Sequence, residues 1–241
     1  MIPCRLPSET DILSFVGDLR AYVFCDERSR LDGILSFLRS FSSDEVTDAF
    51  LAALPGIADD LKTDVEAIVG NDPAAKGADE VIACYPGVKV MINYRAAHLL
   101  LQLGVEVVPR MITELAHSLT GIDIHPAARI GRWFAIDHGT GVVIGETAVI
   151  GEHVTLYQGV TLGAKNFRYD EQGRPVNLPR HPILEDNVTV YSNTSILGRV
   201  TIGHDTVVGG NIWLTHDVPP NSKILQSNAV YVREFSEGAG I

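Results

Sequence analysis

Two adjacent side chains in the middle of the sequence have the types and the setting for proton transfer. Asp137 and His138 are followed by Gly139-Thr140-Gly141, and they lie at a break in a repeating pattern. An imidazole with its ordinary pKa can take up a proton and return it near pH 7, and neighbouring glycines leave space for a substrate. A solvent-exposed histidine with no chemical task is the alternative, and for a lone histidine it is the commoner one.

A carboxylate that could support this histidine stands earlier in the chain, at Asp123. If it accepted the second ring N–H of His138, it would fix the orientation of the imidazole. Turn formation ahead of Pro126 is the alternative role for Asp123. Another reactive pair, Arg180-His181, lies at a second break in the pattern, and breaks in regular scaffolds are where functional residues are usually placed.

The pattern that these residues interrupt is a hydrophobic repeat of six residues. This period fits neither an α-helix nor an ordinary strand. It is typical of hexapeptide repeats, in which each repeat forms one flat side of a parallel β-helix and three repeats complete a triangular coil. The aliphatic residues expected to point inward are Ile124, Ile130, Ile136, Ile144, Ile150, Leu156, Leu162, Leu184, Val190, Ile196, Ile202, Val208 and Leu214. A second inward column is expected at Ala128, Thr140, Ala148, Val154, Val160, Val188, Thr194, Val200 and Thr206.

The repeat is broken twice. Eight residues separate Ile136 from Ile144, which places two extra residues around 139–142. Leu162 and Leu184 are 22 residues apart, so about 16 extra residues, roughly 165–180, leave the solenoid as an excursion.

The first half of the chain carries helix signals instead of repeats. Ser42 and Glu45 have the spacing of a capping box, which opens a helix expected to end near Pro55, and a second helix is expected over 58–69. Asp72-Pro73 resembles an N-cap followed by proline at the first helical position. Apolar helices are expected over 88–103 and 107–119.

These signals predict an α+β protein in three parts: an α-helical N-terminal domain at 1–121, a β-helix domain at 122–224, and a C-terminal tail at 225–241. The net charge is −11 and no basic cluster stands out, which argues against nucleic acid or an anionic membrane as the partner. The three cysteines, Cys4, Cys25 and Cys84, are widely spaced and form no CxxC pair. We therefore expect a cytoplasmic protein.

Other chemistries lack their motifs. The sequence holds no GxGxxG, GxxxxGK[ST], GxSxG or HExxH run. Some β-helix trimers bind zinc through paired histidines five residues apart, and none of the eight histidines has that spacing. We therefore expect no metal site.

Several runs closely resemble those of the serine O-acetyltransferases, which are hexapeptide-repeat enzymes. The resemblance covers roughly residues 70–220. Its segments are Asp72-Pro73-Ala74, Tyr94-Arg95, His98, Asp123-Ile124-His125-Pro126, Asp137-His138-Gly139-Thr140-Gly141, Gly145-Glu146-Thr147, Gln158-Gly159-Val160-Thr161-Leu162-Gly163, Arg180-His181-Pro182 and Val218-Pro219-Pro220.

The resemblance implies a left-handed β-helix and a direct transfer of acetyl from acetyl-CoA to the hydroxyl of L-serine, giving O-acetylserine for cysteine biosynthesis. Acetyl-CoA would be a co-substrate, and no permanently bound cofactor is expected. His138 would be the general base, paired with Asp123. Asp72 and Asp137 would bind the ammonium group of serine, and Arg180 with His181 would hold its carboxylate.

The resemblance also places coenzyme A in a groove between subunits of a trimer or a hexamer. The aligned contact positions are Gly163, Ala164, Ser192 and Gly210. This chain differs from the family at three places. Tyr191-Ser192-Asn193 stands where a Gly-Ala-Gly run is usual, Gln226-Ser227-Asn228-Ala229 replaces the usual GxPA turn after Pro220, and the excursion at 165–180 is longer than usual.

The chain ends in Gly238-Ala239-Gly240-Ile241. Serine acetyltransferases commonly end in a similar run, whose isoleucine enters the active site of cysteine synthase, so the resemblance makes Ile241 the contact with that partner. A tail with no bound partner is the alternative.

Three other functions remain open at this point. The first is a hexapeptide acetyltransferase that acts on a sugar or another hydroxyl acceptor. The second is a zinc protein like the gamma carbonic anhydrases, and the third is an assembly scaffold without catalysis. An acceptor panel with acetyl-CoA, together with a metal analysis, separates them.

Overall fold

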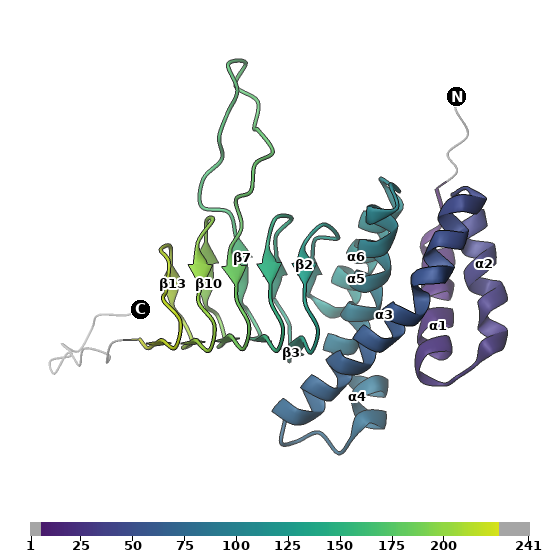
Figure 1. The fold of residues 1–241 in the computed structure, drawn as a ribbon, viewed down its shortest axis with the longest axis horizontal. Coiled ribbons are helices and arrows are strands. Elements are labelled where there is room, and N and C mark those ends of the chain that lie inside the picture. Colours follow the sequence, from purple (N-terminus) through teal and green to yellow (C-terminus); the bar gives the residue numbers. More distant parts are fainter. Residues whose placement is uncertain (1–5, 227–241) are drawn as a thin grey trace, which may run out of the picture.

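The computed structural model describes residues 6–226, a group of helices that continues into a three-sided solenoid (Figure 1). No helix in that range is both long and apolar enough to cross a membrane. The helices are α1 (Glu9–Phe24), α2 (Leu31–Arg39), α3 (Asp44–Asn71), α4 (Ala78–Cys84), α5 (Pro86–Gln102) and α6 (Val108–Thr120), with a 3₁₀ turn η1 (Arg28–Arg30).

Local signals set several helix ends. Ser8 and Asp11 form a capping box at the start of α1, and the Ser43 hydroxyl accepts a hydrogen bond from Val46 N at the start of α3. Gly121 ends α6 in the left-handed conformation, with a φ of 71°. The two apolar helices expected over 88–103 and 107–119 are confirmed as α5 and α6.

Three predictions about the helical part are wrong. The N-cap of α3 is Ser43, so Ser42 and Glu45 do not form the expected capping box. Pro55 does not end a helix, because α3 runs through it from Asp44 to Asn71 and joins the two helices expected there. Leu54, Ile57 and Leu61 are buried on either side of the proline, and this packing compensates for the backbone hydrogen bond that proline removes. Asp72 is not an N-cap but the residue that follows α3, where its Oδ1 accepts from Ala74 N at 2.8 Å.

The solenoid consists of three parallel sheets, one on each side of the triangle. Sheet A has the order β1-β4-β7-β10-β13, sheet B the order β11-β8-β5-β2, and sheet C the order β14-β12-β9-β6-β3. The strands are β1 (Asp123–Ile124), β2 (Arg129–Ile130), β3 (Ala135–Asp137), β4 (Val143–Ile144), β5 (Val149–Ile150), β6 (Thr155–Tyr157), β7 (Thr161–Gly163), β8 (Ile183–Leu184), β9 (Thr189–Val190), β10 (Ser195–Leu197), β11 (Thr201–Ile202), β12 (Val207–Val208), β13 (Trp213–Leu214) and β14 (Lys223–Ile224).

The predicted inward column is confirmed, since twelve of its thirteen aliphatic residues are buried and Ile130 is partly buried. The second column differs at one place. Thr140 is exposed and Val142 takes the inward position. The shift follows from the first break in the repeat, which lies earlier than expected.

The register of the strands locates that break. Asp137 pairs with Tyr157, whereas the next aligned contact is Gly159 N donating to Thr140 O. His138 and Gly139 therefore have no counterparts in the following coil, and the two extra residues are His138 and Gly139. The second break is confirmed as a long excursion between β7 and β8, which projects from the solenoid in Figure 1.

The first coil has no coil before it, and helical side chains satisfy its open backbone groups. Arg95 on α5 binds both carboxylate oxygens of Asp64 on α3, at 2.7 and 2.8 Å, and also donates to Gly131 O. Asp64 accepts from Phe134 N, and the Tyr94 hydroxyl donates to Ala128 O at 2.6 Å. We call this set of hydrogen bonds the polar seam; it joins the helices to the solenoid.

Because the Arg95 and Asp64 side chains are only 7% and 1% exposed, loss of one leaves a buried charge without its partner. We expect Arg95→Met to lower the free energy of unfolding by roughly 3–5 kcal/mol. Chemical denaturation measures this, with Arg28→Met as the control, since Arg28 forms an ion pair that is mostly exposed. Equal stability of the two variants would contradict this role of the polar seam.

Candidate active site

His138 projects from the solenoid on a strained turn. Gly139 N donates to Asp137 O at 2.7 Å, which closes a γ-turn centred on His138, and the histidine φ is +56°. A positive φ is uncommon for a residue with a side chain, although seven other such residues of the solenoid share it, so the γ-turn is what distinguishes His138 here. Gly139 cannot be replaced easily, because a Cβ there would collide with the Ile122 side chain. The turn leaves the imidazole 73% exposed.

Three further side chains, those of Asp137, Asp72 and Tyr85, lie on one side of this histidine. Asp137 Oδ1 lies 3.9 Å from His138 Nε2. Asp72, at the end of α3, lines the same small cavity as Asp137 and accepts a 2.6 Å hydrogen bond from the Tyr85 hydroxyl. That bond is the main reason why the pKa of Asp72 is lowered and the pKa of Tyr85 is raised to about 12. Asp72 and Asp137 therefore offer two carboxylates beside the imidazole.

Arg180 and His181 lie at a different edge of the solenoid, after the excursion. The Thr147 hydroxyl accepts hydrogen bonds from the backbone N–H groups of Arg180 and His181, at 2.8 and 3.0 Å. The Arg180 guanidinium contacts Glu146 at 2.6 Å and Asn177 at 2.7 Å. These contacts fix the base of the excursion against the corner that follows β4.

His181 is held as a neutral imidazole. Its Nδ1 accepts a hydrogen bond from Thr147 N at 3.0 Å, so the ring proton is on Nε2. Burial, and then the charge of Arg180, lower the pKa of His181 to about 4. Gly145 makes room for the ring, since a Cβ at that position would overlap it. At neutral pH, Nε2–H is therefore available as a hydrogen-bond donor.

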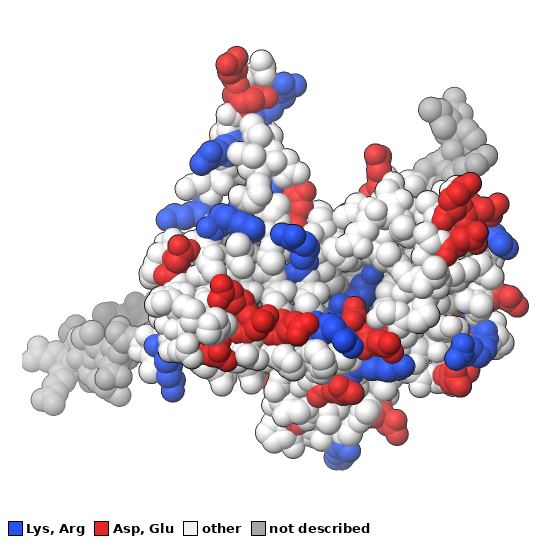
Figure 2. Space-filling view, viewed as in Figure 1, with Lys and Arg blue, Asp and Glu red and all other residues white. Residues whose placement is uncertain are grey.

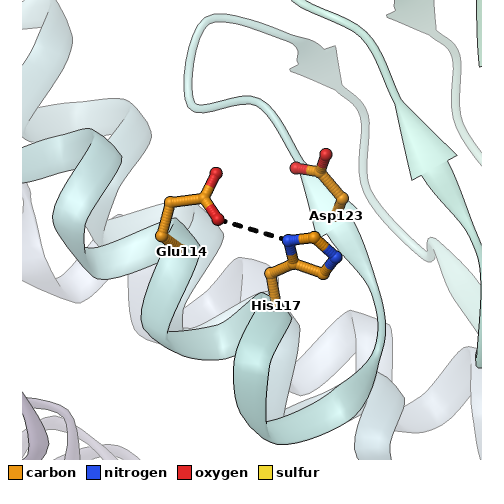
Figure 3. Close-up of side chains that lie close together, drawn as sticks. All are labelled: Glu114, His117 and Asp123. Carbon is orange, nitrogen blue, oxygen red and sulfur yellow. Dashed lines mark hydrogen bonds and ion pairs between the residues drawn. The ribbon is translucent and has the colours of Figure 1, made fainter.

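Asp123 does not contact His138 in this structure. Its carboxylate instead lies 3.5 Å from the Arg110 guanidinium on α6, and Arg110 also pairs with Glu114. Glu114, His117 and Asp123 converge closely enough to resemble a metal site (Figure 3). Arg110 contacts both carboxylates, and His117 Nδ1 contacts Glu114. Because these groups already have partners, the arrangement gives no positive indication of a metal ion. The predicted pairing of Asp123 with His138 stays a prediction.

The predicted site residues fall on two edges of sheet A. The histidine edge, where sheet C turns into sheet A, carries Asp137, His138, Ser192 and Gly210, with Asp72 beside it. The arginine edge, where sheet A turns into sheet B, carries Gly163, Ala164, Arg180 and His181. One side of six residues is roughly 15–20 Å long, so one chain keeps these two groups apart. Asp123 lies on sheet A between the two edges.

A pocket of about 490 Å³ opens on the arginine edge at the base of the excursion. Its lining includes Lys165, Arg168, Arg180 and Arg199. Figure 2 shows Lys and Arg side chains gathered in this region of an otherwise acidic protein. The pocket is therefore suited to an anionic group.

Sequence reasoning missed two residues that organise these groups. Tyr85 was visible only as part of a turn, Tyr85-Pro86-Gly87, and its contact with Asp72 joins two segments 13 residues apart. Thr147 lies 33 residues before Arg180 in the chain. Its run Gly145-Glu146-Thr147 belongs to the stretch that carries the resemblance, which was the signal available.

The chain was compared with known proteins. No family model matches it. It is 50% identical over 198 residues to a plasmid serine acetyltransferase of Synechococcus elongatus, covering 82% of this chain and 62% of that protein. It is 41% identical over 170 residues to the serine acetyltransferase of Helicobacter pylori, covering 70% of this chain and 95% of that protein. The chain thus spans less than two thirds of the first relative and nearly all of the second.

Solved structures of serine acetyltransferases superpose on this chain. Serine acetyltransferase 1 of Entamoeba histolytica, in complex with L-cysteine, superposes with a TM-score of 0.81 at 36% identity, over 88% of this chain and 86% of that chain. A serine acetyltransferase in complex with CoA superposes with a TM-score of 0.65 at 28% identity, over 74% of this chain and 71% of that chain. The helical part followed by the parallel solenoid is consistent with a left-handed β-helix.

The lowered pKa of His181 predicts a pH dependence of stability. In the unfolded chain the imidazole has its ordinary pKa of 6.5, and in the folded chain the pKa is about 4. The unfolded state therefore binds the proton first, so this contribution to stability is complete above pH 6.5 and is lost as the pH falls through about 4. An NMR titration of the ring should give a midpoint near 4, and His181→Asn should flatten the acid side of the stability curve. A midpoint near 6.5 would contradict the assignment.

Proposed function

The chain belongs to the serine acetyltransferase family, and from that membership we propose that it transfers the acetyl group of acetyl-CoA to the hydroxyl of L-serine. The products are O-acetylserine, for cysteine biosynthesis, and CoA. The observation that carries the proposal is the exposed His138 on its strained turn, with two carboxylates beside it.

In the proposed reaction His138 moves one proton. Its unprotonated ring nitrogen removes the proton of the serine hydroxyl while the oxygen attacks the thioester carbonyl. The new C–O bond forms, the C–S bond breaks, and the imidazolium returns the proton to the CoA thiolate. A positioned base of this kind contributes roughly 10²–10⁴-fold to the rate. Because acetyl passes directly between the two substrates, the mechanism needs no nucleophilic side chain.

Serine has two charged groups, and the two edges of sheet A offer a partner for each. Asp72 and Asp137 suit the ammonium group, while the Arg180 fork and the Nε2–H of His181 suit the carboxylate. A serine molecule is only a few ångströms long and cannot bridge the two edges of one chain. We therefore propose that the histidine edge of one subunit meets the arginine edge of the next in a trimer, which can pair into a hexamer.

Acetyl-CoA would lie in the same groove. The family alignment places its contacts at Gly163 and Ala164 on the arginine edge and at Ser192 and Gly210 on the histidine edge, so these contacts also need two subunits. A relative that superposes on this chain was solved in complex with CoA, the product of the proposed reaction, which supports acetyl-CoA as the donor. The basic pocket beside Ala164 and Lys165 has the charge that the phosphates of CoA require.

Two further proposals concern the parts of the chain at either end. The helical part at 1–121, the β-helix at 122–224 and the tail at 225–241 are proposed as the three units of the protein, in a cytoplasmic setting inferred from its cysteines. Ile241 lies outside the described residues, and we propose it as the contact with cysteine synthase. Deletion of Ile241 should abolish that complex in a pull-down and leave acetyl transfer intact; undiminished binding would refute it.

The proposed function is tested by the release of CoA thiol from acetyl-CoA with a panel of acceptors. We expect L-serine to be acetylated in preference to sugar hydroxyls, and His138→Ala to lower turnover by at least about 10²-fold. Asp123→Asn should lose less, because it removes orientation and not the base.

His153→Ala is the matched control, because His153 is also exposed and also has a φ of +56°. It should keep wild-type turnover. Full activity of His138→Ala would refute the assignment of the base, and acetylation of a sugar in place of serine would refute the acceptor.

A further inference from the structure

Two stacked tyrosines continue the histidine edge, and the proposed reaction does not yet use them. The rings of Tyr157 and Tyr191 have centroids 4.8 Å apart and an interplanar angle of 13°. Tyr191 is 42% exposed. The family usually has a small residue at the position of Tyr191, so this stack distinguishes the chain from the usual pattern.

The register of sheet C puts this stack in line with the candidate base. Asp137 pairs with Tyr157 across β3 and β6. Leu156 pairs with Val190 across β6 and β9, so Tyr191 follows at the next coil. Asp137, Tyr157 and Tyr191 therefore occupy the same outward position on successive coils, about 4.8 Å apart. The rings begin one coil away from the acid beside His138.

The electrostatics of Tyr157 agree with this placement. Burial is the main cause that raises its pKa, followed by the neighbouring Tyr191 and then by the charges of Asp137 and Asp72. The phenol therefore stays neutral at physiological pH and remains a hydrogen-bond donor.

Next to the stack lies a polar atom that lacks a partner. Gln158 directly follows Tyr157, and within residues 6–226 its Oε1 is buried without a hydrogen bond. A buried acceptor of this kind is costly unless a donor reaches it. Ser192, which the family alignment assigns to CoA, follows Tyr191 in the equivalent place, and Asn193 N donates to Gln158 O.

The pantetheine arm of acetyl-CoA has the chemistry that this surface accepts. It alternates methylene pairs with planar amides, and its first amide N–H lies roughly one coil spacing from the thioester sulfur. Aromatic faces cover methylenes and amide planes, and the Gln158 oxygen can accept an amide N–H.

We propose that the Tyr157–Tyr191 stack and Gln158 bind the pantetheine arm of acetyl-CoA and thereby position its thioester beside His138. The inference rests on the proposed function, which supplies acetyl-CoA as the donor. It adds three residues that touch the co-substrate beyond the family-aligned positions.

The test is the affinity of the intact protein for CoA, measured by calorimetry without serine, together with steady-state kinetics. Tyr191→Ala should raise the Kd for CoA and the KM for acetyl-CoA roughly 5- to 10-fold, and should change the KM for serine less than about twofold. Tyr191→Phe keeps the ring and should bind CoA like the wild type. Tyr169→Ala is the control, since Tyr169 is an exposed ring on the excursion.

Unchanged CoA affinity in a folded Tyr191→Ala would overturn the proposal, and so would equal weakening in Tyr191→Phe. Because CoA binding is measured without serine, a wild-type protein that binds CoA but acetylates no serine refutes the proposed function alone. A wild-type protein that binds no CoA refutes both.

Discussion

The structure depends on how the open end of the solenoid is closed. A parallel β-helix satisfies its backbone groups from coil to coil, so the first coil has donors and acceptors with no neighbour. Here Arg95, Asp64 and Tyr94 supply the missing partners. The same α3 that carries Asp64 ends at Asn71, and Asp72 follows directly, near the turn of His138. The polar seam thus fixes the helical part on the solenoid and, through it, one carboxylate of the candidate site.

The candidate catalytic and substrate-binding residues lie at the two breaks of the hexapeptide repeat. Two inserted residues, His138 and Gly139, leave the regular path and form a strained turn, which the ladders on either side hold in place. The longer excursion returns at Arg180-His181, where Thr147 receives both backbone N–H groups. A regular scaffold supplies rigidity, and each break supplies an outward side chain. The two breaks open on opposite edges of sheet A, so the complete site belongs to an assembly.

The sequence predicted what depends on short-range periodicity. The inward aliphatic column, the excursion, α5 and α6 follow from spacing and from helix-ending residues. Two features, among others, were predicted wrongly from the sequence. Pro55 lies inside α3 because apolar residues on both sides of it are buried together. Val142 replaces Thr140 at the inward position because the two extra residues are His138 and Gly139. The contacts of Tyr85 and Thr147 could not be predicted either, since each joins segments that only the folded chain brings together. The roles of the site residues came from the family resemblance and stay predictions.

The central claim is that each site combines the histidine edge of one subunit with the arginine edge of its neighbour. The most direct measurement is the activity of assemblies that contain both His138→Ala and Arg180→Leu chains, each nearly inactive alone. In a mixed trimer one of the three interfaces joins two intact edges, so random mixing should restore about a quarter of wild-type activity at low serine. Native mass spectrometry verifies that mixed assemblies form. Mixed trimers with no more activity than the separate variants, or an active monomer, would contradict the account.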